Sequence, residues 1–262
     1  MAWLWRSGPA AAAQIAEQAA SFELRAEGSF PLQYIETVTE TSLRHVLTDA
    51  PFLGLTATAH LQPDLSASIY TEAGHSTLGS FRDNDDTFAS VGGNIVKRWG
   101  AFSAGVSFKH SRLYDGVFGG TDTIANDVDL SVRRVWRPDG DHRIVAGARV
   151  TARLDETFSA QRYSYGSRFD IERRLIGSWW AVAAARIRFS DYVGDDAGRW
   201  DTRLAVVGGL KYEFNDSVSA RMVAGYEDRM SNVASRNSDK FSVGASLDFN
   251  IDLMRPRWPG GR

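Results

Sequence analysis

The chain has 262 residues and no cysteine, which excludes a disulfide scaffold and a zinc site built on thiolates. Its 30 lysines and arginines nearly balance its 32 aspartates and glutamates, so no overall basicity indicates a nucleic-acid partner. The sequence contains no run of about 18 apolar residues that would form a transmembrane helix.

The N-terminal segment, residues 1–28, is expected to be a helical, export or linker segment that precedes the main domain. Residues 9–26 are rich in alanine, and Pro9 suits the first turn of a helix. Residues Met1–Ala13 make a poor secretory signal, because Arg6 follows the first apolar residues and Pro9 interrupts the next ones.

From residue 29 onward, apolar and polar residues alternate, and a period of two is typical of β-strands. In the last such segment the odd positions from Phe241 to Leu253 are apolar, and the even positions between them are polar or glycine. Its length exceeds the usual strand of about 5–6 residues. The alternation predicts about twelve strands, at residues 30–40, 52–61, 64–73, 87–98, 101–112, 126–137, 142–155, 162–174, 178–190, 200–214, 217–229 and 239–253.

Short turns and longer connections alternate strictly between these strands. The short turns lie at residues 62–64, 100, 138–141, 177 and 215–216, and the longer connections at 41–51, 74–86, 113–125, 156–161, 191–199 and 230–238. Outer-membrane barrels have short periplasmic turns and long external loops. The sequence therefore predicts an all-β fold: a closed antiparallel transmembrane β-barrel, an up-and-down meander, over residues 29–253, with 254–262 as a tail.

Two glycine pairs inside the predicted strands, Gly92-Gly93 and Gly208-Gly209, are expected to mark bends or bulges that help the sheet to close. A soluble β-sandwich, which would bury the apolar faces between two sheets, is the competing fold.

An even strand number would place both termini in the periplasm, in a protein that crosses the outer membrane several times. The expected partners are outer-membrane lipids, lipopolysaccharide and the barrel assembly machinery. Trp99, Trp136, Trp179 and Trp200 lie close to strand ends, as in the aromatic belts of membrane proteins, although aromatic residues also favour strands in general. Because such a protein must be exported, we expect a different start or a longer protein of which this chain is the C-terminal part.

The polar faces of the strands carry arginines together with carboxylates. Strand parity directs the following candidate solute-binding residues into the lumen: Arg133, Arg149, Arg153, Arg168, Arg186, Arg188, Arg203, Arg221, Asp170, Glu172 and Glu213. Opposite charges on neighbouring strands would brace the interior. Alternatively, the guanidinium groups would select anionic or sugar-like solutes.

A catalytic role is the less favoured interpretation. His75 and the run Asp83-Asn84-Asp85-Asp86 share one predicted external loop, and omptin-type outer-membrane proteases use acidic residues and a histidine near the outer rim. A solvated acidic loop explains the same residues. Metal-ligand spacings of histidine, Gly-x-Ser-x-Gly and phosphate-binding loops are absent from the sequence, so we expect no enzyme, no metal site and no cofactor.

The C-terminal part carries a resemblance to a known type of barrel. Tyr226-Glu-Asp-Arg-Met-Ser-Asn232, followed by a loop and the strand 239–253, resembles the Tyr-x-x-Arg-x-Ser-Asn ending of Gram-negative porin-type barrels and of surface lipoprotein assembly modifiers. The last strand is similar to the terminal signal of such barrels, although Met254–Arg262 replace the usual aromatic terminus. The resemblance implies an outer-membrane barrel and no catalytic residue.

These observations together lead to one expected function and its alternatives. The expected function is a porin-like channel that passes or binds a small or extended polar solute. The alternatives are the C-terminal barrel of an export or secretion machine for polysaccharide or protein and, less favoured, an outer-membrane hydrolase.

Overall fold

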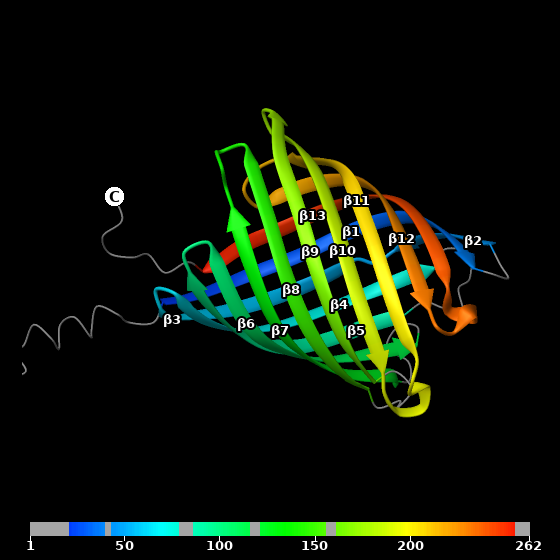
Figure 1. The fold of residues 1–262 in the computed structure, drawn as a ribbon. Coiled ribbons are helices and arrows are strands. Elements are labelled where there is room, and N and C mark those ends of the chain that lie inside the picture. The colour runs from blue at the N-terminus through cyan, green and yellow to red at the C-terminus, as the bar shows by residue number, and fades with distance from the viewer. Residues whose placement is uncertain (1–20, 40–42, 79–85, 116–120, 156–160, 255–262) are drawn as a thin grey trace, which may run out of the picture.

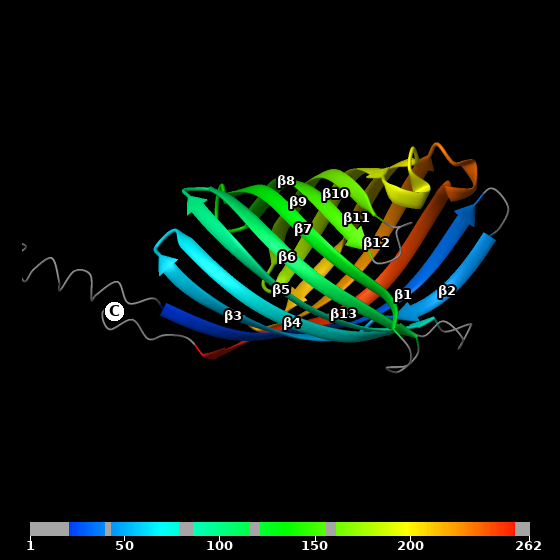
Figure 2. The same ribbon diagram turned by 90° about the horizontal axis from the view of Figure 1, so that it is seen from below.

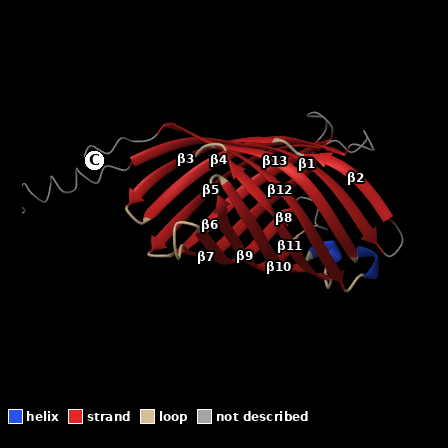
Figure 3. Ribbon diagram, turned by 90° about the horizontal axis from the view of Figure 1, so that it is seen from above, coloured by secondary structure: helices blue, strands red, loops and turns tan. Residues whose placement is uncertain are grey.

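The structure, a computed structural model, describes residues 21–39, 43–78, 86–115, 121–155 and 161–254. Nearly all of them belong to strands: β1 (Ser21–Thr39), β2 (Leu43–Asp49), β3 (Phe52–Gln62), β4 (Leu65–Leu78), β5 (Asp86–Trp99), β6 (Phe102–Asp115), β7 (Thr121–Trp136), β8 (His142–Asp155), β9 (Arg162–Ile176), β10 (Trp179–Tyr192), β11 (Trp200–Glu213), β12 (Val218–Ser231) and β13 (Ser238–Met254). The 3₁₀ helices η3 (Gly194–Asp196) and η4 (Ala234–Arg236) lie together at one end of the molecule (Figure 3).

The strands form one closed antiparallel barrel, as the sequence predicts. Consecutive strands pair along the whole meander, and β13 closes the ring by pairing with β1 from Leu24 opposite Met254 to Thr39 opposite Ser238. The strands run obliquely around the barrel (Figures 1 and 2). The ring has 12 strand positions, because β2 and β3 together fill one of them.

A proline divides that position into two strands. The pairing of β1 with β3 ends at Ser29 opposite Phe52 and resumes in the same register with β2 at Leu32 opposite Asp49. Pro51 stands in the gap, where its missing N–H interrupts the ladder. Its carbonyl oxygen still accepts a hydrogen bond from the backbone N–H of His75 at 3.1 Å. The prediction of a long connection over residues 41–51 is therefore wrong, because Leu43–Asp49 form β2.

The predicted N-terminal helix is not found in the part of residues 9–26 that the structure describes. Residues 21–26 form the beginning of β1, and residues 9–20 lie outside the described ranges. The period of two extends back to Ser21, and Arg25 on the polar face pairs with Glu23 and, at 3.0 Å, with Asp252 of β13. Pairing with two neighbouring strands here outweighs the helix preference of the alanine-rich segment.

The short turns all lie at one end of the barrel. β1 begins and β13 ends at this same end, and the strand ends that border the longer connections lie at the other (Figure 1). In the turn between β7 and β8, the Asp139 carboxylate accepts backbone hydrogen bonds from Asp141 and His142, each at 2.8 Å. The hydrogen bond from the His142 ring also lowers the pKa of the Asp139 carboxyl.

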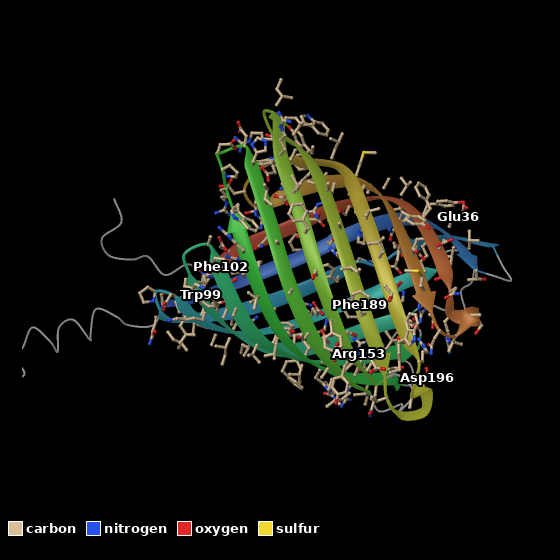
Figure 4. All side chains as sticks on the ribbon, viewed as in Figure 1. Glu36, Trp99, Phe102, Arg153, Phe189 and Asp196 are labelled. Atoms are coloured by element: carbon tan, nitrogen blue, oxygen red, sulfur yellow. The ribbon has the colours of Figure 1, made fainter. Side chains whose placement is uncertain are left out.

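The outer face of the barrel is apolar. Ile69 is 69% exposed and Met222 is 67% exposed, and their cross-strand neighbours on this face are apolar or small. Trp99 and Phe102 lie at the short-turn end of this surface, and Phe189 lies toward the other end (Figure 4). A barrel with this exterior is suited to face lipid, with aromatic residues near both interfaces. Within the described ranges, no helix is both long and apolar enough to cross a membrane.

The glycine pairs do not form bulges, because the strand register continues unbroken through both. One glycine of each pair, Gly92 and Gly209, instead permits close approach on the inner face. A Cβ on Gly92 would lie 2.4 Å from Cζ of Tyr70, whose ring covers the glycine. A Cβ on Gly209 would lie 2.0 Å from the carbonyl oxygen of Met222, whereas one on Gly208 would meet nothing closer than 4.0 Å.

The two neighbouring glycines provide a matched test of this packing. Gly209→Ala forces the backbones of β11 and β12 apart and should lower the free energy of unfolding by about 1–3 kcal/mol. Gly208→Ala, on the lipid face of the same strand, should leave it nearly unchanged. Urea titration of the folded barrel in detergent, followed by gel mobility, measures both variants, and equal midpoints would contradict the close approach.

Candidate functional site: the charged lumen

The polar faces of the strands line the interior. Lys109 on β6 forms an ion pair with Glu72 on β4, although β5 lies between them, so both side chains reach into the lumen. Strand pairing places all the candidate residues predicted from the sequence on this inner face. The structure separates them into a paired group and a group without carboxylate partners.

Several of the candidates brace neighbouring strands. Arg153 donates two hydrogen bonds of 2.7 Å to Asp127, its direct partner on β7. Arg221 lies 3.6 Å from Asp248 on β13 and Arg149 lies 4.0 Å from Asp129 on β7, whereas Arg168 pairs at 2.5 Å with Asp170 of its own strand, β9. Cross-strand ion pairs therefore join β7 to β8 at Arg149 and Arg153, and β12 to β13 at Arg221.

Glu172 and Glu213 belong to a separate cluster at the short-turn end. Lys211, which is buried, lies 2.8 Å from Glu213 and 3.7 Å from Glu172, and Arg143 lies 3.2 Å from Glu172. The indole N–H of buried Trp180 donates to Glu213 at 2.8 Å. Both carboxylates are thus neutralised by cations that the sequence-based prediction did not include.

The inner face of β7–β11 carries a concentration of arginines, which we call the arginine wall. It consists of Arg133, Arg149, Arg153, Arg162, Arg168, Arg186, Arg188 and Arg203. Asp127, Asp129 and Asp170 are the carboxylates on these strands that pair with it. Positive charge therefore exceeds negative charge on this side of the lumen.

Arginines within the wall lie directly opposite one another. The register pairs Arg153 with Arg162, Arg168 with Arg186, and Arg188 with Arg203. Within the described part of the chain, no ion pair is found for Arg133, Arg162, Arg186, Arg188 or Arg203. The Nε atom of Arg188 is buried and has no hydrogen-bond partner there. Like charges in direct cross-strand positions lower the stability of a sheet.

Glycines and one aromatic ring are neighbours of these long side chains. Gly147 lies directly opposite Arg133, and Gly166 lies directly opposite both Arg149 and Arg188. The guanidinium of Arg162 lies 5.6 Å from the centre of the Tyr192 ring, which is a cation–π distance. Strand parity, applied to the first residue of the strand predicted at 162–174, would have identified Arg162.

A buried ionic network supports the longer-connection end of the wall. The Asp201 side chain is 1% exposed, and it accepts hydrogen bonds from Arg199 at 2.9 and 3.2 Å and from Arg229 at 2.5 Å. Arg199 also pairs with Asp196 of η3 and stacks on Tyr192 at 3.8 Å. This network connects the η3 segment to β11 and β12, and the sequence-based prediction did not identify it.

The described residues do not assemble the catalytic site considered above. His75 lies on the same face of β4 as the lipid-facing Ile69, and its Nδ1 lies 3.0 Å from the Thr87 hydroxyl. Asp86 occupies the opposite, inner face of β5, and Asp83–Asp85 lie outside the described ranges. In the part of the chain that the structure describes, no group of three or more residues could hold a metal ion.

Comparison with known proteins identifies the fold. No protein-family model and no curated protein matches the sequence. Among solved structures, an outer membrane channel from Pseudomonas putida F1 is 11% identical, with 87% of this chain and 95% of that chain covered and a TM-score of 0.58. A bacterial polysaccharide outer membrane secretin is 12% identical, with coverages of 88% and 98% and a TM-score of 0.52.

The chain has the porin-like fold of an outer-membrane β-barrel. This fold confirms the predicted architecture and agrees with the apolar exterior. At these sequence identities, the comparison shows the fold alone. The function of the lumen therefore has to be inferred from the residues that line it.

The Asp201 network yields a stability prediction. Asp201→Asn removes the buried carboxylate that Arg199 and Arg229 share, although Arg199 keeps its ion pair with Asp196, and we expect the free energy of unfolding to fall by about 3 kcal/mol. Asp191→Asn changes an exposed carboxylate directly opposite Trp200 and serves as the matched control. Urea unfolding in detergent measures both, and an Asp201→Asn barrel as stable as the control would show that the network contributes little.

Proposed function

We propose that this protein is an outer-membrane channel that passes anionic polar solutes along the arginine wall. The observation that carries the proposal is the direct cross-strand pairing of arginines, such as Arg188 with Arg203, for which no ion pair is found among the described residues. A passing anion would supply the missing counter-charge through the charge-assisted hydrogen bonds that guanidinium groups form. The same unbalanced charge would repel cations.

The strands across the ring present a different chemistry. The inner faces of β3 and β4 carry the hydroxyl residues Thr56, Thr58, Ser66 and Ser68, of which Thr58 and Ser68 hydrogen-bond at 2.9 Å. In the order of the strands around the ring, β3 and β4 lie opposite β9 and β10, which carry much of the arginine wall. Guanidinium groups on one side and hydroxyl groups on the other favour a hydroxylated organic anion, such as an acidic sugar.

The two kinds of connection support one orientation in the membrane. We propose that the short-turn end, with Ser21 and Met254, faces the periplasm and that the η3 end faces outward. Short turns at the periplasmic side and longer connections outside are the arrangement of outer-membrane barrels. In this orientation, the Asp201 network supports the external mouth.

The export-barrel alternative stays a prediction. It depends on sequence that would precede the barrel, and no contact within the described strands favours it over a channel. A longer reading frame that encodes helical repeats ahead of residue 1 would favour it.

Ion selectivity in planar bilayers tests the channel. Arg203→Gln should lower the ratio of chloride to potassium permeability by about fivefold, because roughly 1 kcal/mol of Coulomb energy is lost when one unit charge is removed at about 4 Å from the ion in water. Arg173→Gln removes a charge from the outer face of β9 and should leave the ratio unchanged. The proposal fails if both variants keep the original selectivity or if the unmodified barrel prefers potassium.

A further inference from the structure

A groove of about 660 Å³ crosses the outer face of the barrel from β6 to β11. Its floor consists of the small residues Ala146, Ala148, Ser167 and Ala185, and Phe102 and Trp136 lie at its short-turn end. Strand pairing puts these residues on the same face as the exposed Val150 and Leu130, so the groove opens toward lipid. Its surface is almost entirely apolar.

The groove arises because small side chains meet on adjacent strands. Ala148 on β8 lies directly opposite Ser167 on β9. The larger Phe169 of β9 lies between Ala146 and Ala185 and also lines the groove. On the flanking strands, the same face carries the larger Val132 and Leu204. In a membrane, lipid chains fill such a depression, because the side chains around an empty space would lose their dispersion contacts.

Among the arginines that line the groove, Arg134 has its side chain on the outer face, whereas Arg133, Arg168 and Arg186 belong to the inner face. Arg134 lies on the outer face of β7, directly opposite Phe102 and Ala146, and it lines the groove. Its guanidinium carbon lies 4.8 Å from the centre of the Phe102 ring and 4.5 Å from that of Trp136. No ion pair or hydrogen bond of its side chain is found among the described residues. Lys97, on the same face and at the same end, instead pairs with Asp64 at 2.6 Å.

We propose that this groove and Arg134 together bind one phospholipid molecule. The acyl chain lies along Ala146, Ala148, Ser167 and Ala185, where small side chains allow close contact. The phosphodiester accepts hydrogen bonds from the Arg134 guanidinium, which the two aromatic rings hold in place. The proposal depends on the lipid-facing exterior and not on what passes through the lumen, so it stands or falls separately from the channel function.

Charge favours a lipid over a second copy of this chain. Two copies that pack groove to groove around a twofold axis would present the same surface to each other and bring their Arg134 guanidinium groups to one interface. Those groups would have no carboxylate to neutralise them, and burying unpaired charges is unfavourable. A phosphate supplies the opposite charge at the end of the groove where the cation lies.

Native mass spectrometry of the full chain in detergent, titrated with dioleoylphosphatidylglycerol, tests the proposal. We expect one tightly retained lipid per chain. Arg134→Gln should weaken this binding about tenfold, because a charge-assisted hydrogen bond is lost, and Arg134→Lys should retain part of it. Ala148→Leu fills the floor of the groove and should weaken binding without removing any charge.

Two control variants make matched changes elsewhere on the outer face. Lys97→Gln removes a neutralised cation at the same end, and Ala224→Leu enlarges an outward residue on β12; both should bind lipid as the unmodified chain does. Gel mobility before and after heating confirms that each variant is folded. The proposal is overturned if Arg134→Gln and Lys97→Gln bind equally well. It is also overturned if the chain is a dimer that Ala148→Leu dissociates while lipid retention persists.

Discussion

The backbone ladder between β1 and β13 is the constraint on which the remaining structure depends. In hydrocarbon, an unpaired backbone N–H or C=O costs several kcal/mol, so a sheet stays there only when its two edges meet. Closure also fixes the face of every side chain. A shift of one residue in any ladder would turn the inward arginines of that strand toward lipid and its apolar residues toward water.

Within the closed ring, charge is distributed unevenly. Near the two ends, carboxylates neutralise most cations, as in the Lys211 cluster and the Asp201 network. Along the wall strands, arginine lies opposite arginine, and the buried Nε atom of Arg188 has no hydrogen-bond partner within the described ranges. Like charges placed opposite one another lower the stability of the sheet, and such local destabilisation is typical of functional sites. On the outer face, Arg134 likewise has no carboxylate partner among the described residues, and its position between two aromatic rings is suited to binding a phosphate.

Most strands could be predicted from the sequence, but two segments could not. Alternation predicted the strands and the inward face of every candidate residue, because side-chain direction depends only on position within a strand. Residues 21–26 and 43–49 were misassigned. Alanine content indicated a helix in the first case, and the second segment was assigned to the longer connection over residues 41–51. Both segments are strands because a neighbouring strand satisfies their backbone groups, and that gain is not visible in local sequence.

By itself, the sequence determined the barrel, its apolar exterior and its charged lumen, because a period of two sorts residues between two faces without reference to any partner. Only the tertiary structure decided which charges meet. Asp127 on β7 forms an ion pair with Arg153, and Arg162 lies opposite Arg153 on the other side, on β9. Glu213 forms an ion pair with Lys211 and accepts a hydrogen bond from Trp180. The register between strands sets these contacts, and that register depends on the closure of the whole ring.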